Sequence, residues 1–171
     1  MQPHLICLDL DGTLLNDNKE ISSYTKQVLN ELQQRGHQIM IATGRPYRAS
    51  QMYYHELNLT TPIVNFNGAY VHHPKDKNFK TCHEILKLGI NKARGIEQVR
   101  QFLNIDRNNI IAFGDEDNDI EMIEYARHGV AMENGLQELK DVANNITFNN
   151  NEDGIGRYLN DFFNLNIRYY C

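Results

Sequence analysis

The amino-acid sequence predicts an α/β domain of three layers, with a mostly parallel sheet between two layers of helices. Short apolar segments of strand length alternate with amphipathic segments of helix length, which is the pattern of repeated βα units. The chain has 171 residues, enough for one domain with a buried core and too few for two full domains. We therefore expect a single domain over residues 1–171.

The first part of the chain contains three predicted strands and two predicted helices. The strands are expected at His4–Leu8, Gln38–Ala42 and Ile63–Phe66. The first helix starts at Ser22 or Ser23, either of which can cap it, and runs to about Arg35, where Gly36 ends it. The second helix is expected at Pro46–Leu57, because proline is well accommodated in a first helical turn.

Residues 70–91 do not follow this pattern. They contain His72 and His73 in an irregular polar stretch, with a possible short strand near Lys80–Ile85. Adjacent histidines without further residues at ligand spacing are more often solvated than metal-bound. We expect this segment to form a short linker or hairpin.

The alternation of strands and helices returns after residue 91. Helices are expected at Lys92–Leu103, Ile120–Ala126, Leu136–Ala143 and Gly154–Phe163. Strands are expected at Ile110–Phe113, Gly129–Met132 and Ile146–Phe148.

Composition and charge argue against several classes of protein. Hydrophobic residues make up 41% and charged residues 23% of the chain, as in soluble globular proteins, and no run approaches the roughly 20 apolar residues of a membrane span. The net charge is −5 and there is no dense Lys/Arg cluster, so no nucleic-acid partner is expected.

The N-terminus and the cysteines indicate a cytoplasmic protein. The segment Met1–Leu8 leads directly into a predicted strand and lacks the features of a secretory signal. The three cysteines, Cys7, Cys82 and Cys171, are widely spaced and include no CxxC pair. We therefore expect reduced thiols rather than disulfides or a zinc site.

Polar motifs directly follow three of the predicted strands. DLDGT occupies 9–13, TGR occupies 43–45 and GDEDND occupies 114–119. Because the carboxyl ends of parallel strands meet at one edge of a sheet, these motifs are expected to form one ligand site. Carboxylates gathered there repel one another unless a cation joins them. Carboxylate ligands without Cys or His favour magnesium, which commonly bridges to a substrate phosphate.

Taken together, these motifs resemble those of the haloacid dehalogenase (HAD) superfamily of phosphatases. DLDGT matches the first family motif, Thr43 the second, Lys92 the third and GDEDND the fourth. The segments LDLDGTLL, IATGR, NGA at 67–69, GINKARG, GVAMENG and NNEDGI are similar to those of the Cof-type branch. The resemblance extends over residues 4–160 and implies a Rossmann-like core and Mg²⁺-dependent hydrolysis of a small phosphorylated metabolite, such as a sugar phosphate or cofactor phosphate.

The resemblance also implies a role for each motif residue. Asp9 is the expected nucleophile, which forms an aspartyl phosphate. Asp11 is the expected general acid and base, and its backbone carbonyl joins Asp9 and Asp115 as a magnesium ligand. The remaining expected roles are phosphate binding by Thr43, Gly44, Lys92 and Asn118, and a supporting role for Asp119, which orients Lys92 or metal-bound water.

Each of these residues also has a simpler interpretation. Asp9 and Asp11 alone would be an ordinary pair of solvated loop carboxylates, and Thr43 alone would be a helix cap. Lysine is a common residue on exposed helix surfaces, which gives an alternative for Lys92. The occurrence of all motifs in order favours the catalytic interpretation. Arg45 is interpreted as a surface residue near a helix start and is not included in the catalytic set.

The chain departs from the Cof-type pattern in one respect. Cof-type relatives insert an α/β cap domain between the NGA segment and the third-motif lysine, where this chain has only residues 70–91. Four explanations of the missing cap remain open. The chain is a weak and broad phosphatase, it uses a neighbouring subunit as a lid, it acts on a large substrate, or it derives from a gene that lost the cap. A homo-oligomer is therefore a possible state, whereas a membrane partner is not expected.

Two other functions remain open from the sequence. A phosphomutase-like phosphoryl transferase requires a closed site that excludes water, which a missing cap does not favour. A phosphate-binding or assembly module with little turnover would not need the complete set of Asp9, Asp11, Thr43, Lys92 and Asp115.

Overall fold

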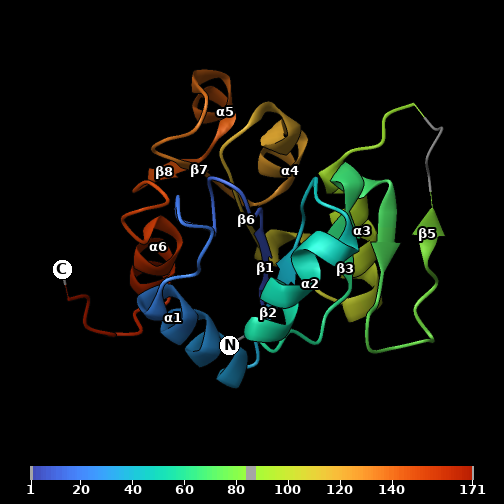
Figure 1. Ribbon diagram of the computed structural model, residues 1–171, viewed down its shortest axis with the longest axis horizontal. Helices are drawn as coiled ribbons and strands as arrows, with labels where there is room; N and C mark the ends of the chain where they lie inside the picture. The colour runs from blue at the N-terminus through green and yellow to red at the C-terminus, as the bar shows by residue number, and fades with distance from the viewer. Residues whose placement is uncertain (1, 84–87, 171) are drawn as a thin grey trace.

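The computed structural model describes residues 2–83 and 88–170 and has a parallel sheet of five strands at its centre (Figure 1). The strand order is β2-β1-β6-β7-β8, and all four pairings are parallel. The strands are β1 Leu5–Leu8, β2 Gln38–Ile41, β6 Ile110–Gly114, β7 His128–Met132 and β8 Asn145–Thr147. The predicted α/β fold with a mostly parallel sheet is confirmed.

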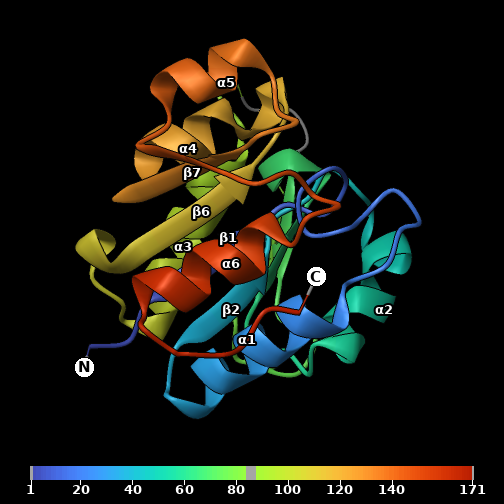
Figure 2. The same cartoon turned by 90° about the vertical axis from the view of Figure 1, so that its left-hand side faces the viewer.

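Helices cover both faces of this sheet, as the alternation of apolar side chains along the strands requires. In β1, Ile6 and Leu8 belong to one buried cluster, whereas Leu5 and Cys7 belong to the other. The first cluster is closed by α1 Ser23–Gln34, α2 Tyr47–Glu56 and α6 Gly154–Phe162. The second is closed by α3 Lys92–Leu103, α4 Ile120–Tyr125 and α5 Gln137–Val142. Figure 2 shows α1 and α6 lying side by side across the sheet.

Local sequence signals set where the helices begin. The Ser22 hydroxyl accepts the Thr25 N–H at 3.0 Å and caps α1, as the sequence predicted. The Asn91 side chain accepts the Arg94 N–H at 3.1 Å and caps α3. This cap makes Lys92 the first residue of α3. Nearly all predicted strands and helices are confirmed with ends within one residue of those expected.

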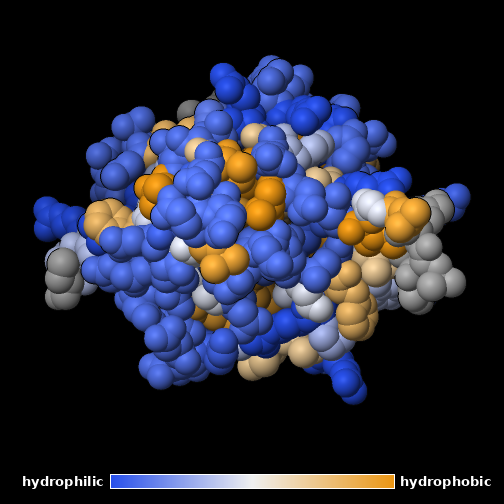
Figure 3. Space-filling view, turned by 90° about the horizontal axis from the view of Figure 1, so that it is seen from above, coloured by the Kyte–Doolittle hydropathy of each residue, from blue (hydrophilic) through white to orange (hydrophobic). Residues whose placement is uncertain are grey.

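A second, antiparallel sheet lies beside the first and contains β3 Ile63–Asn65, β4 Tyr70–His72 and β5 Cys82–His83. A single parallel bridge between Ala42 and Val64 connects β3 to the end of β2. Apolar side chains are visible on this side of the molecule when it is seen from above, at the right of Figure 3. A tight turn at Phe66–Gly68 joins β3 to β4.

The second sheet is where the sequence interpretation was incomplete. The strand at Tyr70–His72 was not predicted, because only its central residue, Val71, is apolar and faces the core. The short strand expected near Lys80–Ile85 is present as Cys82–His83, and the rest of that prediction, at 84–85, lies outside the described residues. None of the helices in the described ranges is long and apolar enough for a bilayer span.

Close packing of α3 on the second sheet depends on Gly95, so we predict a loss of stability in Gly95→Ala. A Cβ at this position would lie 2.8 Å and 2.9 Å from the two γ-carbons of Val64. Alanine has the better helix propensity by about 1 kcal/mol, but overpacking costs about 1–3 kcal/mol. Urea denaturation should show a net loss, whereas the control Arg94→Ala, at an exposed position of the same helix, should change stability by less than about 0.5 kcal/mol. Equal stability of the two variants would contradict this packing.

Candidate active site

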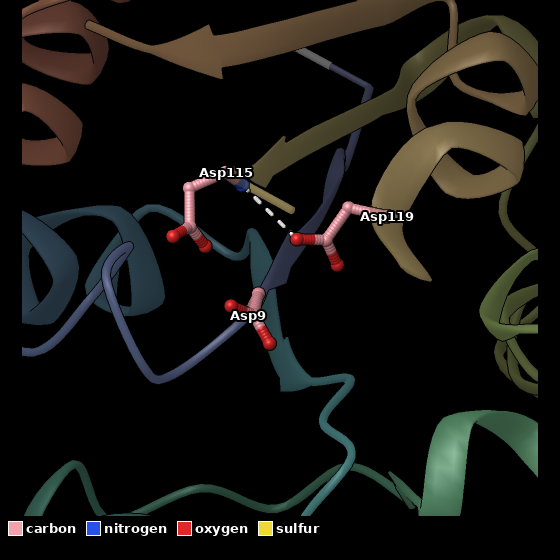
Figure 4. A group of neighbouring side chains, drawn as sticks. All are labelled: Asp9, Asp115 and Asp119. Carbon is pink, nitrogen blue, oxygen red and sulfur yellow. Dashed lines mark hydrogen bonds between the residues drawn. The ribbon is translucent and has the colours of Figure 1, made fainter. Parts of the chain in front are cut away.

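The polar motifs meet at one edge of the parallel sheet. Because β1 and β6 are neighbours with Leu8 opposite Phe113, Asp9 and Asp115 follow the ends of adjacent strands. Asp119 lies one short turn further on, at the end of the 3₁₀ helix Asp117–Asp119. Figure 4 shows the three carboxylates pointing into a common space between β1, β6 and α4.

These three carboxylates are unusually well buried for acidic side chains. The exposed fractions are 6% for Asp9, 6% for Asp115 and 0% for Asp119. Each residue has a carboxylate oxygen within 4.8 Å of the corresponding oxygens of the other two. Like charges at such distances in a buried environment require compensation.

Lys92 supplies part of this compensation from the first turn of α3. Its ammonium group donates hydrogen bonds to Asp9 Oδ1 at 2.7 Å and to Asp119 Oδ1 at 2.6 Å. Burial by itself lowers the pKa of Lys92, but Asp9 and Asp119 more than offset this effect and raise it above its ordinary value. Lys92 is 0% exposed, so the alternative of a lysine on a solvated helix surface is wrong.

Asp119 uses both of its oxygens for contacts within the protein. Oδ2 accepts the backbone N–H groups of Asp115 at 3.0 Å and Glu116 at 3.2 Å, while Oδ1 accepts the Lys92 ammonium. This arrangement fixes the loop that carries Asp115 and the orientation of Lys92. Its position therefore agrees with a supporting role better than with direct metal coordination.

Asp9 and Asp115 have fewer compensating contacts. Burial raises the pKa of Asp9 above its ordinary value, and Asp119 adds to the rise, which Lys92 opposes only in part. Burial also raises the pKa of Asp115, although its Oδ1 accepts the Thr13 hydroxyl at 2.8 Å. One ammonium among three carboxylates leaves negative charge that a divalent cation can offset. The oxygen-only donor set fits magnesium.

Gly12 permits the close approach of the Asp115 side chain to the first motif. Its φ is +70°, and a Cβ on it would lie 2.1 Å from Asp115 Oδ2. A larger residue would therefore displace a carboxylate of the cluster. The Gly12 carbonyl also accepts the Asn134 side chain at 2.8 Å.

The carboxylate of Asp11 does not belong to the buried cluster. The Arg45 guanidinium binds it through Nε and Nη2, each at 2.7 Å, and Lys19 Nζ lies 2.8 Å from Oδ1. These partners, Arg45 foremost, hold the pKa of Asp11 well below its usual range. The interpretation of Arg45 as a surface residue missed this contact, although its position in the TGR motif after β2 was a signal for it.

Thr43, Gly44 and Asn118 line the same edge. Thr43 is 1% exposed, and its hydroxyl oxygen accepts the Arg45 N–H at 3.0 Å, so it stabilises the turn before α2. Asn118 donates to Asn67 Oδ1 at 2.9 Å, and the same oxygen lies 3.1 Å from where a Cβ on Gly44 would be. Asn67 had been noted only as part of the NGA motif and is a further residue of this edge.

Comparison with known proteins identifies the family. The model of the haloacid dehalogenase-like hydrolase family matches residues 6–83 and 76–159. The 5-amino-6-(5-phospho-D-ribitylamino)uracil phosphatase YitU of Bacillus subtilis is 33% identical, over 96% of this chain and 99% of the relative. The phosphatase YcsE of the same organism, with the same named substrate, is 26% identical over 90% of this chain and 93% of its own.

Solved structures agree with this result at the level of the fold. A haloacid dehalogenase-like hydrolase from Bacteroides thetaiotaomicron superposes with a TM-score of 0.85, at 22% identity, over 95% of this chain and all of its own. Another from B. subtilis gives a TM-score of 0.78, at 17% identity, over 91% of this chain and 98% of its own. The resemblance found in the motifs is thereby confirmed: the chain belongs to the haloacid dehalogenase-like hydrolase family and is a phosphatase of that family.

Proposed function

We propose that this phosphatase hydrolyses small phosphomonoesters with magnesium, through a covalent aspartyl phosphate on Asp9. The observation that carries the proposal is the contact of one buried ammonium, Lys92, with Asp9. The carboxylate of Asp115 lies beside that of Asp9 (Figure 4). An ion pair with Lys92 holds the nucleophile in place, and the neighbouring carboxylates provide for a metal ion.

In the first step, a carboxylate oxygen of Asp9 attacks phosphorus while the ester oxygen leaves with a proton from Asp11. In the second step, water attacks phosphorus, Asp11 accepts the proton of the water, and Asp9 is regenerated as phosphate departs. Because Arg45 and Lys19 hold the Asp11 carboxylate, Asp11 must exchange at least one of these contacts before it can donate a proton.

Charge on the transferring phosphoryl group is balanced by several donors. We assign this role to the Lys92 ammonium, the Thr43 hydroxyl, the Gly44 N–H and the Asn118 amide. A magnesium ion bound by Asp9, Asp115 and the backbone carbonyl of Asp11 would supply positive charge that reduces the repulsion between nucleophile and phosphate. The roles of these residues rest on their shared position at one sheet edge and on the family motifs.

The relatives support a substrate class for this chain. YitU and YcsE are named for a phosphorylated ribityl compound that carries a uracil ring, and we propose a small phosphorylated metabolite of the sugar-phosphate or cofactor-phosphate type here. We propose a cytoplasmic location for the enzyme, in keeping with a substrate of this type.

We also infer that this single domain has a reduced cap at residues 70–91. The two matches to the family model overlap at residues 76–83, within the segment where the cap was expected. The alignment with YitU extends over 267 positions, more than the 171 residues of this chain, so the relative contains additional residues. The described part of the segment contributes β4 and β5 to the second sheet.

Substitution of the nucleophile tests the reaction. In Asp9→Asn, magnesium-dependent release of the coloured alcohol from a generic aryl phosphate should fall by at least about 10³-fold, since the residual amide is a poor nucleophile. The exposed Asp117 of the same site loop provides a control, and Asp117→Asn should retain turnover within about threefold. Full turnover by Asp9→Asn, or none by the unaltered protein at any magnesium concentration, would reject the proposal.

Magnesium should stabilise the protein more at high pH than at low pH. Burial raises the pKa values of Asp9 and Asp115 in the metal-free folded state, so their ionisation removes stability as pH rises above the unfolded value of about 3.9. A bound divalent cation reverses this cost and requires the ionised forms. The free energy of unfolding with magnesium, minus that with a chelator, should therefore be larger at about pH 8 than at about pH 5.5. If the stabilisation by magnesium increased by the same amount between these two pH values in Asp115→Asn, the metal would bind elsewhere.

Loss of the Arg45 contact should raise the pKa of Asp11. In Arg45→Met the carboxylate loses two charge-assisted hydrogen bonds, so carbon NMR titration of the Asp11 carboxyl should show its pKa moving up toward the ordinary value of about 3.9. Lys19→Met removes only one contact from a more exposed cation and should cause a smaller shift. A larger shift in Lys19→Met would show that Arg45 is not the main partner.

A further inference from the structure

We propose that the outward face of the second sheet binds a planar aromatic leaving group of the phosphate ester. This inference rests on the proposed phosphatase function and assigns the part of the substrate that the acidic cluster does not hold. The leaving-group pocket is lined by Phe66, Ala69, Tyr70 and His83.

The leaving-group pocket is joined to the phosphate site through a short stretch of backbone. The Asn67 N–H donates to the Thr43 carbonyl at 3.1 Å, and the Phe66 N–H donates to the Arg45 carbonyl at 3.4 Å. Asn67 is also the partner of Asn118. Because Phe66 directly precedes Asn67, its Cα lies about 3.8 Å from that of Asn67. A leaving group attached to a phosphate at this edge therefore starts beside Phe66.

The backbone at Phe66 is held in an unfavourable conformation. Phe66 and Asn67 have φ values of 50° and 54°, and Gly68 follows with 98°. A bulky aromatic residue rarely adopts positive φ, and such conformations concentrate at functional sites. The Phe66 side chain gains little burial in return, since it is 51% exposed. A ring presented to solvent by a strained turn beside a polar site fits a binding surface better than a core residue.

Aromatic side chains continue from this turn across the outward face of the sheet. Tyr70 and His83 are register partners with ring centroids 4.6 Å apart, and Tyr70 stacks on His72 at 4.5 Å with an interplanar angle of 19°. Val71, between them, points the opposite way into the core. Outward faces of antiparallel sheets are commonly polar, whereas this one carries the rings of the partly exposed Tyr70 and the exposed His83. The ring of His72 is buried, in contact with both Tyr70 and Tyr47.

The size and position of the leaving-group pocket favour a small ligand over a protein partner. Its volume is about 470 Å³, within the range of small-molecule sites of roughly 300–1,000 Å³. Its lining is apolar and aromatic, so it suits a flat ring that stacks on Phe66 or Tyr70 and does not suit the charged phosphate. Together with the phosphate site it matches a substrate with one anionic end and one planar end.

Turnover of two phosphate esters tests the leaving-group pocket. We expect the ratio of kcat/KM for phenyl phosphate to that for glycerol phosphate to fall about tenfold in Phe66→Ala and in Tyr70→Ala, because stacking is lost. Phe66→Ala keeps a Cβ and thus the backbone strain, so the effect reports on the ring. Phe102 on α3, which is 42% exposed, is the matched control, and Phe102→Ala should not change the ratio. A ratio that is the same in all four proteins would overturn the inference.

Binding of non-hydrolysable analogues separates this inference from the proposed function. In calorimetry with magnesium present, phenylphosphonate should bind about tenfold more tightly than methylphosphonate, and Phe66→Ala should abolish that preference. This preference without any turnover would reject the phosphatase proposal but support the leaving-group pocket. Equal affinity of the two phosphonates would overturn the pocket. A protein dimer that dissociates in Phe66→Ala would also overturn it, in favour of a second copy on this face.

Discussion

The site depends on the compensation of three buried carboxylates by one buried ammonium group. Lys92 lies between Asp9 and Asp119 at hydrogen-bonding distance from both, and the pKa values of Asp9 and Asp115 are raised because burial penalises their charged forms. Each of these residues is fixed by an element of the fold: Asp9 and Asp115 follow two adjacent strands, Lys92 is in the first turn of α3, and Asp119 ends the 3₁₀ helix before α4. A divalent cation would offset the negative charge that remains, which supports the proposed magnesium site.

Most of the fold followed from the sequence because its elements are regular and locally signalled. Apolar strands, Ser22 as a helix cap and the glycine that ends α1 each agree with the final structure. The second sheet did not follow, since β4 contains a single apolar residue, Val71, and the polar ring of His72 beside it is buried all the same. In so short a strand, polar and apolar residues show no clear alternation from which the strand can be predicted.

The candidate site was predictable in its composition and less so in its geometry. Motifs after strands indicated that Asp9, Thr43 and Asp115 would gather at one edge, and the structure brings them there. Contacts between residues far apart in the chain were less predictable: the position of Arg45 after β2 indicates the sheet edge, but nothing local to it identifies Asp11 as its partner. The same holds for Asn67, whose partner is 51 residues away. Long-range pairing of polar groups requires the folded backbone, not only the pattern that forms each element.

A crystal structure with magnesium and beryllium fluoride tests the reactive carboxylate and the metal site beside it at once. Beryllium fluoride imitates a phosphoryl group on a carboxylate and should be found on Asp9, with the magnesium ion in contact with Asp9 and Asp115. Beryllium fluoride bound at another residue, or a magnesium ion that does not touch Asp115, would contradict the assignment of the nucleophile and of the metal ligands.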